Sequence, residues 1–354
     1  MTDLAGKAGP AVNPQKGFLP AFDLAPGDRF PNFLLPDQTG ATRSFLERAK
    51  GNRILIVGDS DDAGLQALEQ AGLGDAGFDC FGLVGEEPEP AAGRAAKLQV
   101  TFPLLADSKG KIRDALRQML GFGPRGAFAA LLDPNQRVIA AMASMQTADL
   151  LTWAITMVRK MPPPDLGYRL TAAAPVLVIP DVLTPEDCRA LIDRWEHLGH
   201  DEGEVHSIVN GVETRRVHRA IKSRRDHNIE DPSIQNELVG VVGRRIAPEL
   251  DKAFGFSRFR FDRFVVTCYD AERGDYFRRH RDNQSPATAD RRFALTLNLN
   301  TGAYEGGELS FPEYGMHRYD PPTGAAILFS CSLLHEALPV RSGRRFTLLN
   351  VLRT

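Results

Sequence analysis

The chain has 354 residues, of which 43% are hydrophobic and 25% are charged, a composition typical of globular proteins. This length is too great for one ordinary compact core, so we expect two domains. The 43 basic and 45 acidic residues leave a net charge of −2, which excludes a bulk electrostatic affinity for nucleic acid. No apolar segment approaches the roughly 18 residues that would predict a membrane span, and residues 1–19 lack the apolar core of a secretory signal.

The positions of the cysteines and histidines indicate the redox compartment and the part of the chain in which a metal site can lie. The four cysteines are widely scattered and form no CxxC pair, which favours a reducing compartment, so we expect a cytoplasmic protein. They are Cys80, Cys188, Cys268 and Cys331. All eight histidines lie at or beyond His197, so metal chemistry based on histidine can belong only to the second half of the chain.

The first part of the chain predicts an α/β domain. Residues 1–19 are rich in Gly, Ala, Pro and Lys and predict a flexible tail. Over residues 20–160, apolar segments alternate with turn signals, and the order strand, helix, strand predicts a layered α/β fold. The expected elements are strands 53–57 and 78–84, a helix at 63–71, a hairpin formed by 128–133 and 138–141, and a closing helix at 150–160.

The second part of the chain predicts a domain of short strands with a few helices. Residues 161–169 contain three consecutive prolines and predict a linker. Thr184 followed by Pro185 predicts the start of a helix that ends near His197. A second helix is expected at 232–254, and strands at 259–269, 293–300, 308–311, 325–329 and 345–352. Residues 214–228 are expected to pass from helix to strand, and we interpret their charges as a solvated face, with a mobile substrate loop as the alternative. Helices followed by many short strands predict, for residues 170–354, a double-stranded β-helix, or jelly roll, with outer helices.

Three residues in this second domain form a candidate metal site. His280 and Asp282 are two positions apart, so in a strand they would point to the same side, and His335 would come from a strand near the end of 325–329. Two imidazoles and one carboxylate are the ligands of non-haem Fe(II) oxygenase sites, which keep three coordination positions open. A hydrolytic zinc site could use the same residue types, and a His-x-Asp pair alone is often a surface salt-bridge loop. The residues by themselves leave these alternatives open.

Three motifs, which follow one another as in a known enzyme group, favour the Fe(II) site over the zinc site and the salt-bridge loop. Residues 335–345, HEALPVRSGRR, resemble the closing motif of the prolyl 4-hydroxylase group of 2-oxoglutarate-dependent dioxygenases. Residues 268–283 resemble the preceding Tyr, Gly, aromatic, HxD-Asn segment, especially that of the oxygen-sensing prolyl hydroxylases, and residues 305–309 match the GGEL strand of the group. The resemblance covers roughly residues 175–354.

This resemblance implies roles for individual residues. His280, Asp282 and His335 would bind Fe(II), and Arg345 would pair with the distal carboxylate of 2-oxoglutarate, for which a bidentate guanidinium is well suited. Strand alternation places Arg345 on the same face as Thr347, whose hydroxyl could bind the same carboxylate. By the same alternation the neighbouring Arg344 would point away, into solvent.

Two further residues are candidates for the cosubstrate site. Tyr269 lies where the family often places a tyrosine on the cosubstrate, although an ordinary core aromatic is an equal alternative. In strand 293–300 the leucines form an apolar face that we expect to meet the outer helices, while Thr296 and Asn298 would line the pocket. Asn298 falls where the oxygen-sensing relatives carry a tyrosine, and this departure puts part of the cosubstrate binding in doubt.

The resemblance also implies an activity. A member of this group hydroxylates an unactivated C–H bond while 2-oxoglutarate is converted to succinate and CO2, with Fe(II) and O2 as cofactors and ascorbate as a further candidate. The substrate would be a prolyl or other amino-acid side chain, in a protein, a peptide or a free amino acid, with neither nucleic acid nor membrane as a partner. The alternative is a non-catalytic interaction or oxygen-sensing scaffold, in which the first domain binds a partner.

The first domain resembles peroxiredoxins of the thioredoxin-like fold. The resemblance lies in residues 27–40, 102–110 and 131–134. A peroxidatic cysteine should follow the strand at 53–57, but residues 58–64 contain no cysteine and are rich in aspartate, which would oppose a thiolate. Cys80 is the only thiol of the domain, and we interpret it as a buried small hydrophobe. We therefore expect no thiol peroxidase activity, and a role in docking, in substrate presentation or in homodimerisation.

Overall fold

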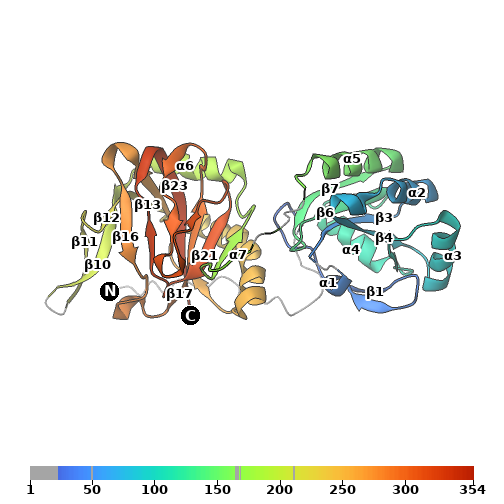
Figure 1. Cartoon of the computed structure of the whole chain (residues 1–354), viewed down its shortest axis with the longest axis horizontal. Coiled ribbons are helices and arrows are strands. Elements are labelled where there is room, and N and C mark those ends of the chain that lie inside the picture. Colours follow the sequence, from blue (N-terminus) through green and yellow to red (C-terminus); the bar gives the residue numbers. More distant parts are fainter. Residues whose placement is uncertain (1–22, 49–50, 164–166, 168, 210–211) are drawn as a thin grey trace. The chain divides into compact units, whose positions relative to one another are not determined.

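The structure is a computed structural model that describes residues 23–48, 51–163, 167, 169–209 and 212–354 (Figure 1). The chain divides into two compact units, and the division falls at Arg169. The predicted tail at 1–19 lies outside the described residues, as does part of the predicted linker at 161–169. Within the described ranges, no helix is both long enough and apolar enough to cross a membrane.

The first unit is built on a five-stranded sheet with the order β5-β4-β3-β6-β7. The first three of these strands run parallel, and β6 and β7 form an antiparallel hairpin. The strands are β3 (Arg53–Gly58), β4 (Phe78–Val84), β5 (Leu104–Ala106), β6 (Ala127–Leu132) and β7 (Val138–Ser144). The helices are α1 (Phe45–Arg48), α2 (Asp62–Gln70), α3 (Pro88–Leu98), α4 (Lys111–Met119) and α5 (Thr147–Lys160), and a two-stranded sheet joins β1 (Leu34–Pro36) to β2 (Thr42–Ser44).

Both faces of this sheet are covered, as the continuous apolar sequence of β3 requires. Ile54 and Ile56 pack into one core, while Leu55 and Val57 pack into the other, because successive side chains of a strand point to opposite faces. Buried side chains of α1 and α4 belong to the first core, and those of α2 and α5 belong to the second. The predicted strands, hairpin and helices are confirmed, and the unit has the thioredoxin-like layer arrangement.

The second unit consists of two facing sheets. The major sheet has the order β8-β21-β17-β23-β15-β13-β9, and the minor sheet has the order β12-β16-β22-β19-β20. The major strands are β8 (Val176–Ile179), β9 (Asp201–Glu202), β13 (Arg225–Asn228), β15 (Val265–Asp270), β17 (Arg291–Asn298), β21 (Ala326–Ser330) and β23 (Val340–Arg353), with β14 (Arg260–Phe261) and β18 (Tyr304–Gly306) pairing with β23. The minor strands are β12 (Lys222–Ser223), β16 (Tyr276–His280), β19 (Leu309–Ser310), β20 (Arg318–Tyr319) and β22 (His335–Ala337), and β10 (Glu204–Val209) pairs with β11 (Val212–Val217) in a hairpin.

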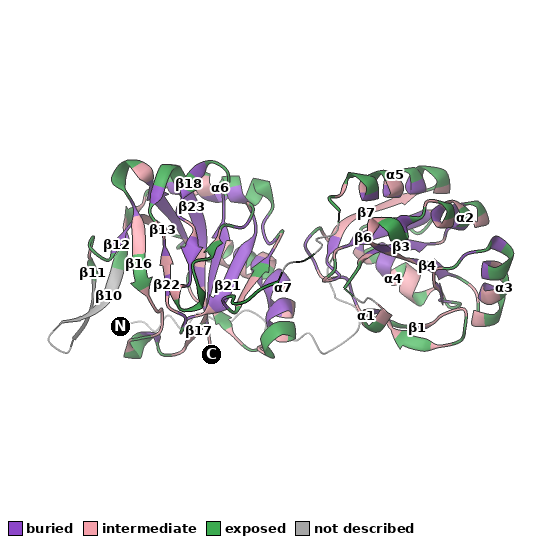
Figure 2. Ribbon diagram, viewed as in Figure 1, coloured by how far each residue is buried: buried purple, intermediate pink, exposed green. Residues whose placement is uncertain are grey.

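Two helices cover the outer face of the major sheet, as predicted. The helix α6 (Pro185–His197) begins with a capping box in which Thr184 and Asp187 exchange hydrogen bonds, and α7 (Pro232–Phe254) ends at Gly255 in the left-handed conformation. Their buried residues share one core with Leu295, Leu297 and Leu299 (Figure 2). The apolar face of β17 therefore meets the helices, which leaves its other face for the space between the sheets. This confirms the predicted jelly roll with outer helices.

Two segments differ from the prediction. Residues 259–269 do not form one strand, because the Asn350 side chain accepts a hydrogen bond from the Asp262 amide (3.1 Å) and donates one to the Asp262 carbonyl (2.7 Å), and the chain between β14 and β15 leaves the ladder. Residues 214–228, expected to pass from helix to strand, are extended and contribute to β11, β12 and β13. In this segment cross-strand pairing prevails over local helix propensity.

A candidate active site between the two sheets

The candidate metal ligands meet where two adjacent inner strands of the minor sheet, β16 and β22, end and begin. His280 is the last residue of β16, and His335 is the first residue of the neighbouring strand β22, where the two are directly paired. Asp282 lies in the turn after β16, and its backbone N–H donates to the Cys331 carbonyl at 2.9 Å. The expectation that His280 and Asp282 share a strand is therefore wrong, whereas His335 comes from β22, the strand that follows β21. The convergence comes from this turn, because it brings the carboxylate back toward both rings.

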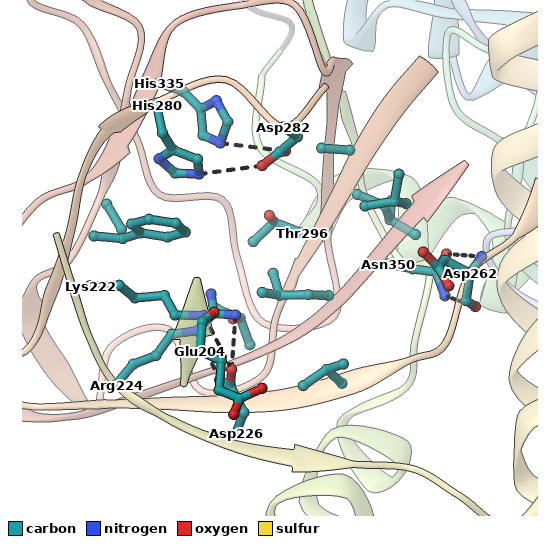
Figure 3. A pocket seen from close by; sticks show the side chains of 18 of the residues that line it. Glu204, Lys222, Arg224, Asp226, Asp262, His280, Asp282, Thr296, His335 and Asn350 are labelled. Atoms are coloured by element: carbon teal, nitrogen blue, oxygen red, sulfur yellow. Dashed lines mark hydrogen bonds and ion pairs between the residues drawn. The ribbon is translucent and has the colours of Figure 1, made fainter. Parts of the chain in front are cut away.

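The ligand atoms of the three residues lie within 4.8 Å of one another. Asp282 Oδ1 is 3.3 Å from His280 Nε2, and Asp282 Oδ2 is 3.7 Å from His335 Nε2 (Figure 3). The two imidazole centroids are 4.2 Å apart. This places two nitrogens and a carboxylate around a single point, which is the donor set of a facial metal site.

Backbone carbonyls orient both imidazoles. His280 Nδ1 lies 2.7 Å from the Arg278 carbonyl, and His335 Nδ1 lies 3.0 Å from the Leu333 carbonyl. A carbonyl can only accept, so each Nδ1 carries the proton and each Nε2 keeps its lone pair for a metal. Burial lowers the pKa of His335 to about 4, so its ring stays neutral near pH 7.

Asp282 is held as a carboxylate. Burial by itself would raise the pKa of Asp282, but the neighbouring His335 and His280, together with the Arg291 guanidinium, hold it well below its ordinary value. Because a divalent cation binds an ionised carboxylate and neutral imidazoles, Asp282 and His335 are in the protonation state that metal binding requires. The donor set thus fits Fe(II), and no thiolate is present among the three to favour a structural zinc site.

Arg345 is a buried cation without a carboxylate partner among the described residues. It lies on β23, and only 1% of its surface is exposed. Its one hydrogen bond within the described part of the chain goes from a terminal nitrogen to Asn298 Oδ1 at 2.9 Å, and its Nε has no partner there. Burying a guanidinium without a counter-ion is costly, so the site is incomplete without an anion.

Asn298 orients Arg345 by a hydrogen bond without itself lining the cavity. It is fully buried and lies on β17, but it is not among the residues that line the cavity beside the triad. Its Nδ2 donates to Asp320 Oδ1 at 2.9 Å and to the Pro321 carbonyl at 3.1 Å, and these bonds turn its Oδ1 toward Arg345. Of the polar face predicted for this strand, Thr296 does line the cavity.

The GGEL segment leaves room for the Arg345 side chain. Gly307 has a φ of +74°, and a Cβ placed on it would lie 2.7 Å from Arg345 Cδ and 2.9 Å from Val340 Cγ2. Any larger residue at position 307 would be both strained in its backbone and in contact with the arginine stem. The second glycine of the motif is therefore a steric requirement of the cation beside it.

Tyr269 and Thr347 line the same cavity, which has a volume of about 1160 Å³. Tyr269 pairs with Arg345 across β15 and β23, and the guanidinium carbon lies 5.7 Å from the centre of its ring. Thr347 Oγ1 is 2.7 Å from Thr267 Oγ1, and both are fully buried. The structure therefore brings Arg345, Tyr269 and Thr347 together on the major sheet, and the triad on the minor sheet faces the same space.

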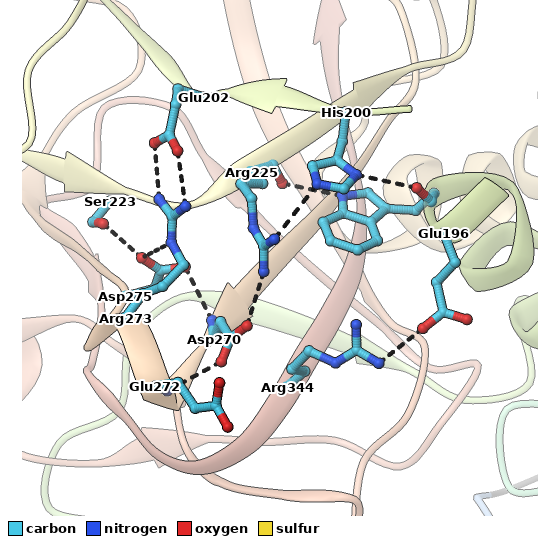
Figure 4. Close-up of polar contacts among 11 residues, drawn as sticks. Glu196, His200, Glu202, Ser223, Arg225, Asp270, Glu272, Arg273, Asp275 and Arg344 are labelled. Carbon is cyan, nitrogen blue, oxygen red and sulfur yellow. Dashed lines mark hydrogen bonds and ion pairs between the residues drawn. The ribbon is translucent and has the colours of Figure 1, made fainter. Parts of the chain in front are cut away.

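Hydrogen bonds and ion pairs link β9, β12 and β13 to the end of β15 and to the residues between β15 and β16 (Figure 4). The Glu202 carboxylate accepts two hydrogen bonds from Arg273, both at 2.8 Å, and Arg225 pairs with Asp270 at 2.8 Å. Asp275 is fully buried and accepts from Ser223 Oγ at 2.5 Å. These bonds fix β12 and β13, which form one wall of the cavity. In the same view Arg344 reaches Glu196 at 2.8 Å, away from the cavity as predicted.

The structure adds three cavity residues that the sequence did not single out. Phe277 stacks on His280 with ring centroids 3.6 Å apart, and Lys222 and Arg224 are both buried in the cavity wall. The two cations belong to the segment 214–228, whose charges we interpreted as a solvated face. The one available signal was the i, i+2 spacing of Lys222 and Arg224, which puts both on the same side of an extended segment.

In the first unit the position of the missing nucleophile is occupied by an ion cluster. Asp59 follows β3 with a φ of 55°, and its carboxylate pairs with both Arg113 and Arg117. Cys80 lies on β4 and is half-buried rather than fully buried as predicted, and its desolvation, reinforced by Asp79, raises the pKa of its thiol to about 12. The thiol is therefore protonated at neutral pH and is a poor nucleophile.

This protonation predicts an inert thiol. The Cys80→Ser variant should consume peroxide at the same rate as wild type, near the rate without protein, because wild type has no thiolate to oxidise. Alkylation of the native protein by iodoacetamide at pH 8, followed by mass spectrometry, should leave Cys80 unmodified. Rapid labelling of Cys80, or peroxide consumption that disappears in the variant, would contradict this.

Comparison with known proteins agrees with this site. Residues 264–353 match the family profile of the 2OG-Fe(II) oxygenase superfamily. The chain is 35% identical over 80 residues to a PKHD-type hydroxylase of Burkholderia thailandensis, covering 20% of this chain and 35% of that protein. It is 26% identical over 188 residues to a PKHD-type hydroxylase of Burkholderia lata, covering 48% of this chain and 74% of that protein. The chain thus spans about a third of the first relative's length and about three quarters of the second's.

Solved structures are similar to each unit. A prolyl-4-hydroxylase of Pseudomonas putida is 18% identical, with a TM-score of 0.39, and the match covers 51% of this chain and 93% of that one. The peroxidoxin BcpB of Mycobacterium tuberculosis is 19% identical, with a TM-score of 0.34, and the match covers 39% of this chain and 99% of that one. The family match rests on the second unit, in the segment that carries the His–Asp–His cluster and Arg345.

Proposed function

We propose that this chain, which carries a 2OG-Fe(II) oxygenase domain, hydroxylates an unactivated C–H bond of an amino-acid side chain, prolyl among the candidates, as 2-oxoglutarate is converted to succinate and CO2. The observation that carries the proposal is a single cavity that holds both the His–Asp–His cluster and the buried, uncompensated Arg345. A metal site alone would suit several reactions. A metal site beside a buried cation suits a metal-chelating dianion.

The triad would hold the metal on one face. His280 and His335 would bind through Nε2 and Asp282 through a carboxylate oxygen, with the other imidazole nitrogens fixed by backbone carbonyls. Bound Fe(II) would supply the oxidising chemistry with O2, while the protein positions the reactants and excludes water. Three protein ligands leave room for a chelating cosubstrate and for O2.

Arg345 would bind the distal carboxylate of 2-oxoglutarate. Its guanidinium has unused donors, and Asn298 already holds one of its terminal nitrogens. Thr347 and Tyr269 lie on the same wall and would supply hydroxyls to the same cosubstrate. Charge-assisted hydrogen bonds of this kind are shorter and stronger than neutral ones.

Aromatic and aliphatic walls would keep water from the reacting carbon. Phe277 covers one face of His280, and the Phe329 ring lies 4.6 Å from the centroid of His335. Leu309 also lines the cavity. Such walls limit the access of solvent to a site in which a strong oxidant is generated.

Succinate formation tests this function directly. The purified protein with Fe(II), O2 and 2-oxoglutarate is expected to release succinate, slowly without substrate and faster with a pool of peptides and amino acids. The measurement is succinate by chromatography, with omission of iron as one control and omission of O2 as another. Absence of succinate under all conditions, together with absence of 2-oxoglutarate binding, would favour the scaffold alternative.

The remaining assignments belong to the same proposal. The units would correspond to domains at 20–160 and 170–354, and the first would act in docking, substrate presentation or homodimerisation. Its ion cluster at Asp59 and its protonated Cys80 support a role without redox chemistry. Ascorbate would serve as a reductant in the assay, and the cytoplasm is the compartment we expect.

A further inference from the structure

The wall that faces the triad carries an excess of buried positive charge. Lys222 and Arg224 line the cavity with 5% and 9% of their surfaces exposed, and Asp226 lies between them. Asp226 is 3.6 Å from Lys222 Nζ and 2.8 Å from Arg224 Nε, so one carboxylate serves two cations. Figure 3 shows these side chains gathered on one wall, across from His280, Asp282 and His335.

Arg224 is held by two side-chain hydrogen bonds and an ion pair, whereas Lys222 is held by one hydrogen bond and a longer ion pair. Arg224 donates to the Tyr269 hydroxyl at 3.0 Å and to Asp226 Oδ2 at 3.1 Å. Within the described part of the chain, Lys222 donates one hydrogen bond, to the Glu204 carbonyl, and has longer contacts with Asp226 and the Phe277 ring. Its ammonium has three donors, so at least one remains for a further acceptor. Lys222 is therefore the less constrained of the two buried cations of this wall.

Lys222 is placed for the substrate rather than for 2-oxoglutarate. It lies on β12, the edge strand of the minor sheet, next to the half-exposed Ile221 and Val217, which also line the cavity. Arg345, on β23 of the major sheet, is the deeply buried cation. Lys222 and Arg345 thus reach the cavity from different sheets.

The distance between Lys222 and the triad limits the position of the anion. Lys222 Nζ is 5.4 Å from the Phe277 ring centre, which is 3.6 Å from the His280 ring centre, so Lys222 is at most about 9 Å from His280. An extended chain spans that distance in roughly three residues. A group bound at Lys222 therefore belongs to the oxidised residue itself or to one of its near neighbours in sequence.

We propose that the substrate carries a carboxylate that binds Lys222 beside Arg224, so that the enzyme selects an anionic amino acid or an acidic position next to the hydroxylated residue of a peptide. This inference rests on the proposed oxygenase function. The carboxylate comes either from a free amino acid or from an Asp, Glu or chain terminus of a peptide. In this wall Asp226 is within 4 Å of both buried cations, while the exposed Glu204 lines the same part of the cavity. A ligand carboxylate would accept from the ammonium of Lys222.

The protonation of Lys222 makes carboxylate binding and the stability of the fold depend on pH. Burial, reinforced by Arg224 and partly offset by Asp226 and Glu204, lowers the pKa of Lys222 to about 7. Because this pKa lies below the ordinary value, the charge is lost as pH rises through about 7, and acid binding weakens above that pH. Between about pH 7 and 10.5 the folded protein holds fewer protons here than the unfolded chain, so this group adds stability as pH rises.

Binding of matched ligand pairs tests the inference. The full-length protein with Fe(II) and 2-oxoglutarate is titrated by calorimetry under argon, which prevents turnover. The probes are free glutamate against glutamine, free proline against prolinamide, and N-acetylated, C-amidated peptides that differ only in Glu against Gln beside a proline. We expect at least one acid to bind about tenfold more tightly than its amide, and this preference to fall below twofold in Lys222→Met. The arm that responds identifies the source of the carboxylate.

Two variants and one readout separate the outcomes. Lys222→Arg keeps the charge and should keep the acid preference with little change above pH 7, whereas the exposed Lys252→Met should behave as wild type. Equal binding of acids and amides, with 2-oxoglutarate bound and consumed, would overturn the inference and leave the proposed function intact. A Lys222→Met protein that loses 2-oxoglutarate affinity instead would reassign this wall to the cosubstrate. Failure of wild type to bind 2-oxoglutarate would overturn both proposals.

Discussion

Arg345→Met is expected to weaken 2-oxoglutarate binding by about 100-fold or more, while the unliganded variant is at least as stable as wild type. Two charge-assisted hydrogen bonds to a carboxylate are worth about 3 kcal/mol or more together, which corresponds to this factor. The buried guanidinium has no carboxylate partner among the described residues, so its removal relieves a desolvation cost. Methionine retains the length of the stem and fills most of the space.

Thermal unfolding with and without 2-oxoglutarate measures both effects. Wild type should be stabilised by about 2.7 kcal/mol at a ligand concentration 100 times the Kd, and the variant should show almost no shift. Arg344→Met is the matched control, because Arg344 is half-exposed and pairs with Glu196 outside the cavity. Unchanged 2-oxoglutarate affinity in Arg345→Met would remove Arg345 from the cosubstrate site.

His335→Ala is expected to reduce metal affinity by about 100-fold or more and to abolish succinate formation. Altering even the outer partners of metal ligands typically costs 10- to 100-fold, so loss of one of three ligands should cost at least as much. The buried His335 ring also packs against Phe329, so the variant leaves a cavity and should unfold at a lower temperature.

Metal titration separates ligand loss from unfolding. Mn(II) binding, followed by electron paramagnetic resonance, reports affinity without turnover, and circular dichroism reports the fold. Asp282→Ala should lose metal in the same way, while His317→Ala, which changes an exposed histidine outside the cluster, should bind Mn(II) as wild type does. Retention of wild-type metal affinity by a folded His335→Ala protein would disprove the ligand assignment.

The sequence predicted the elements whose signals are local. The apolar segments at β3 and β4 are buried on both faces, and Thr184 with Pro185 fixes the start of α6. Burial patterns and capping depend on neighbours a few residues away, so they can be read without knowledge of the fold. The motif around His280 and His335 carried the metal assignment for a different reason, because its residue types and spacing resemble those of a known family.

The residues that the sequence misplaced depend on contacts between distant strands. Asp282 reaches the imidazoles through a turn that is bonded to Cys331, 49 positions away, rather than through strand alternation. Asn298 supports Arg345 instead of facing the cavity, because Asp320 and Pro321 hold its amide. Neither contact can be predicted from the local composition of the sequence.

The amino-acid sequence by itself predicted an α/β unit followed by a jelly roll with outer helices, from periodicity and capping, which act within one element. Strand alternation favoured Arg345 over Arg344. The thioredoxin-like fold and the candidate ligands His280, Asp282 and His335 came from resemblance to known families. Only the tertiary structure decided that Lys222 and Arg224 leave the solvent and face the triad, because that depends on the pairing of β12 with β16. A cation's position relative to a cavity is set by strands far apart in the chain, and so is its desolvation.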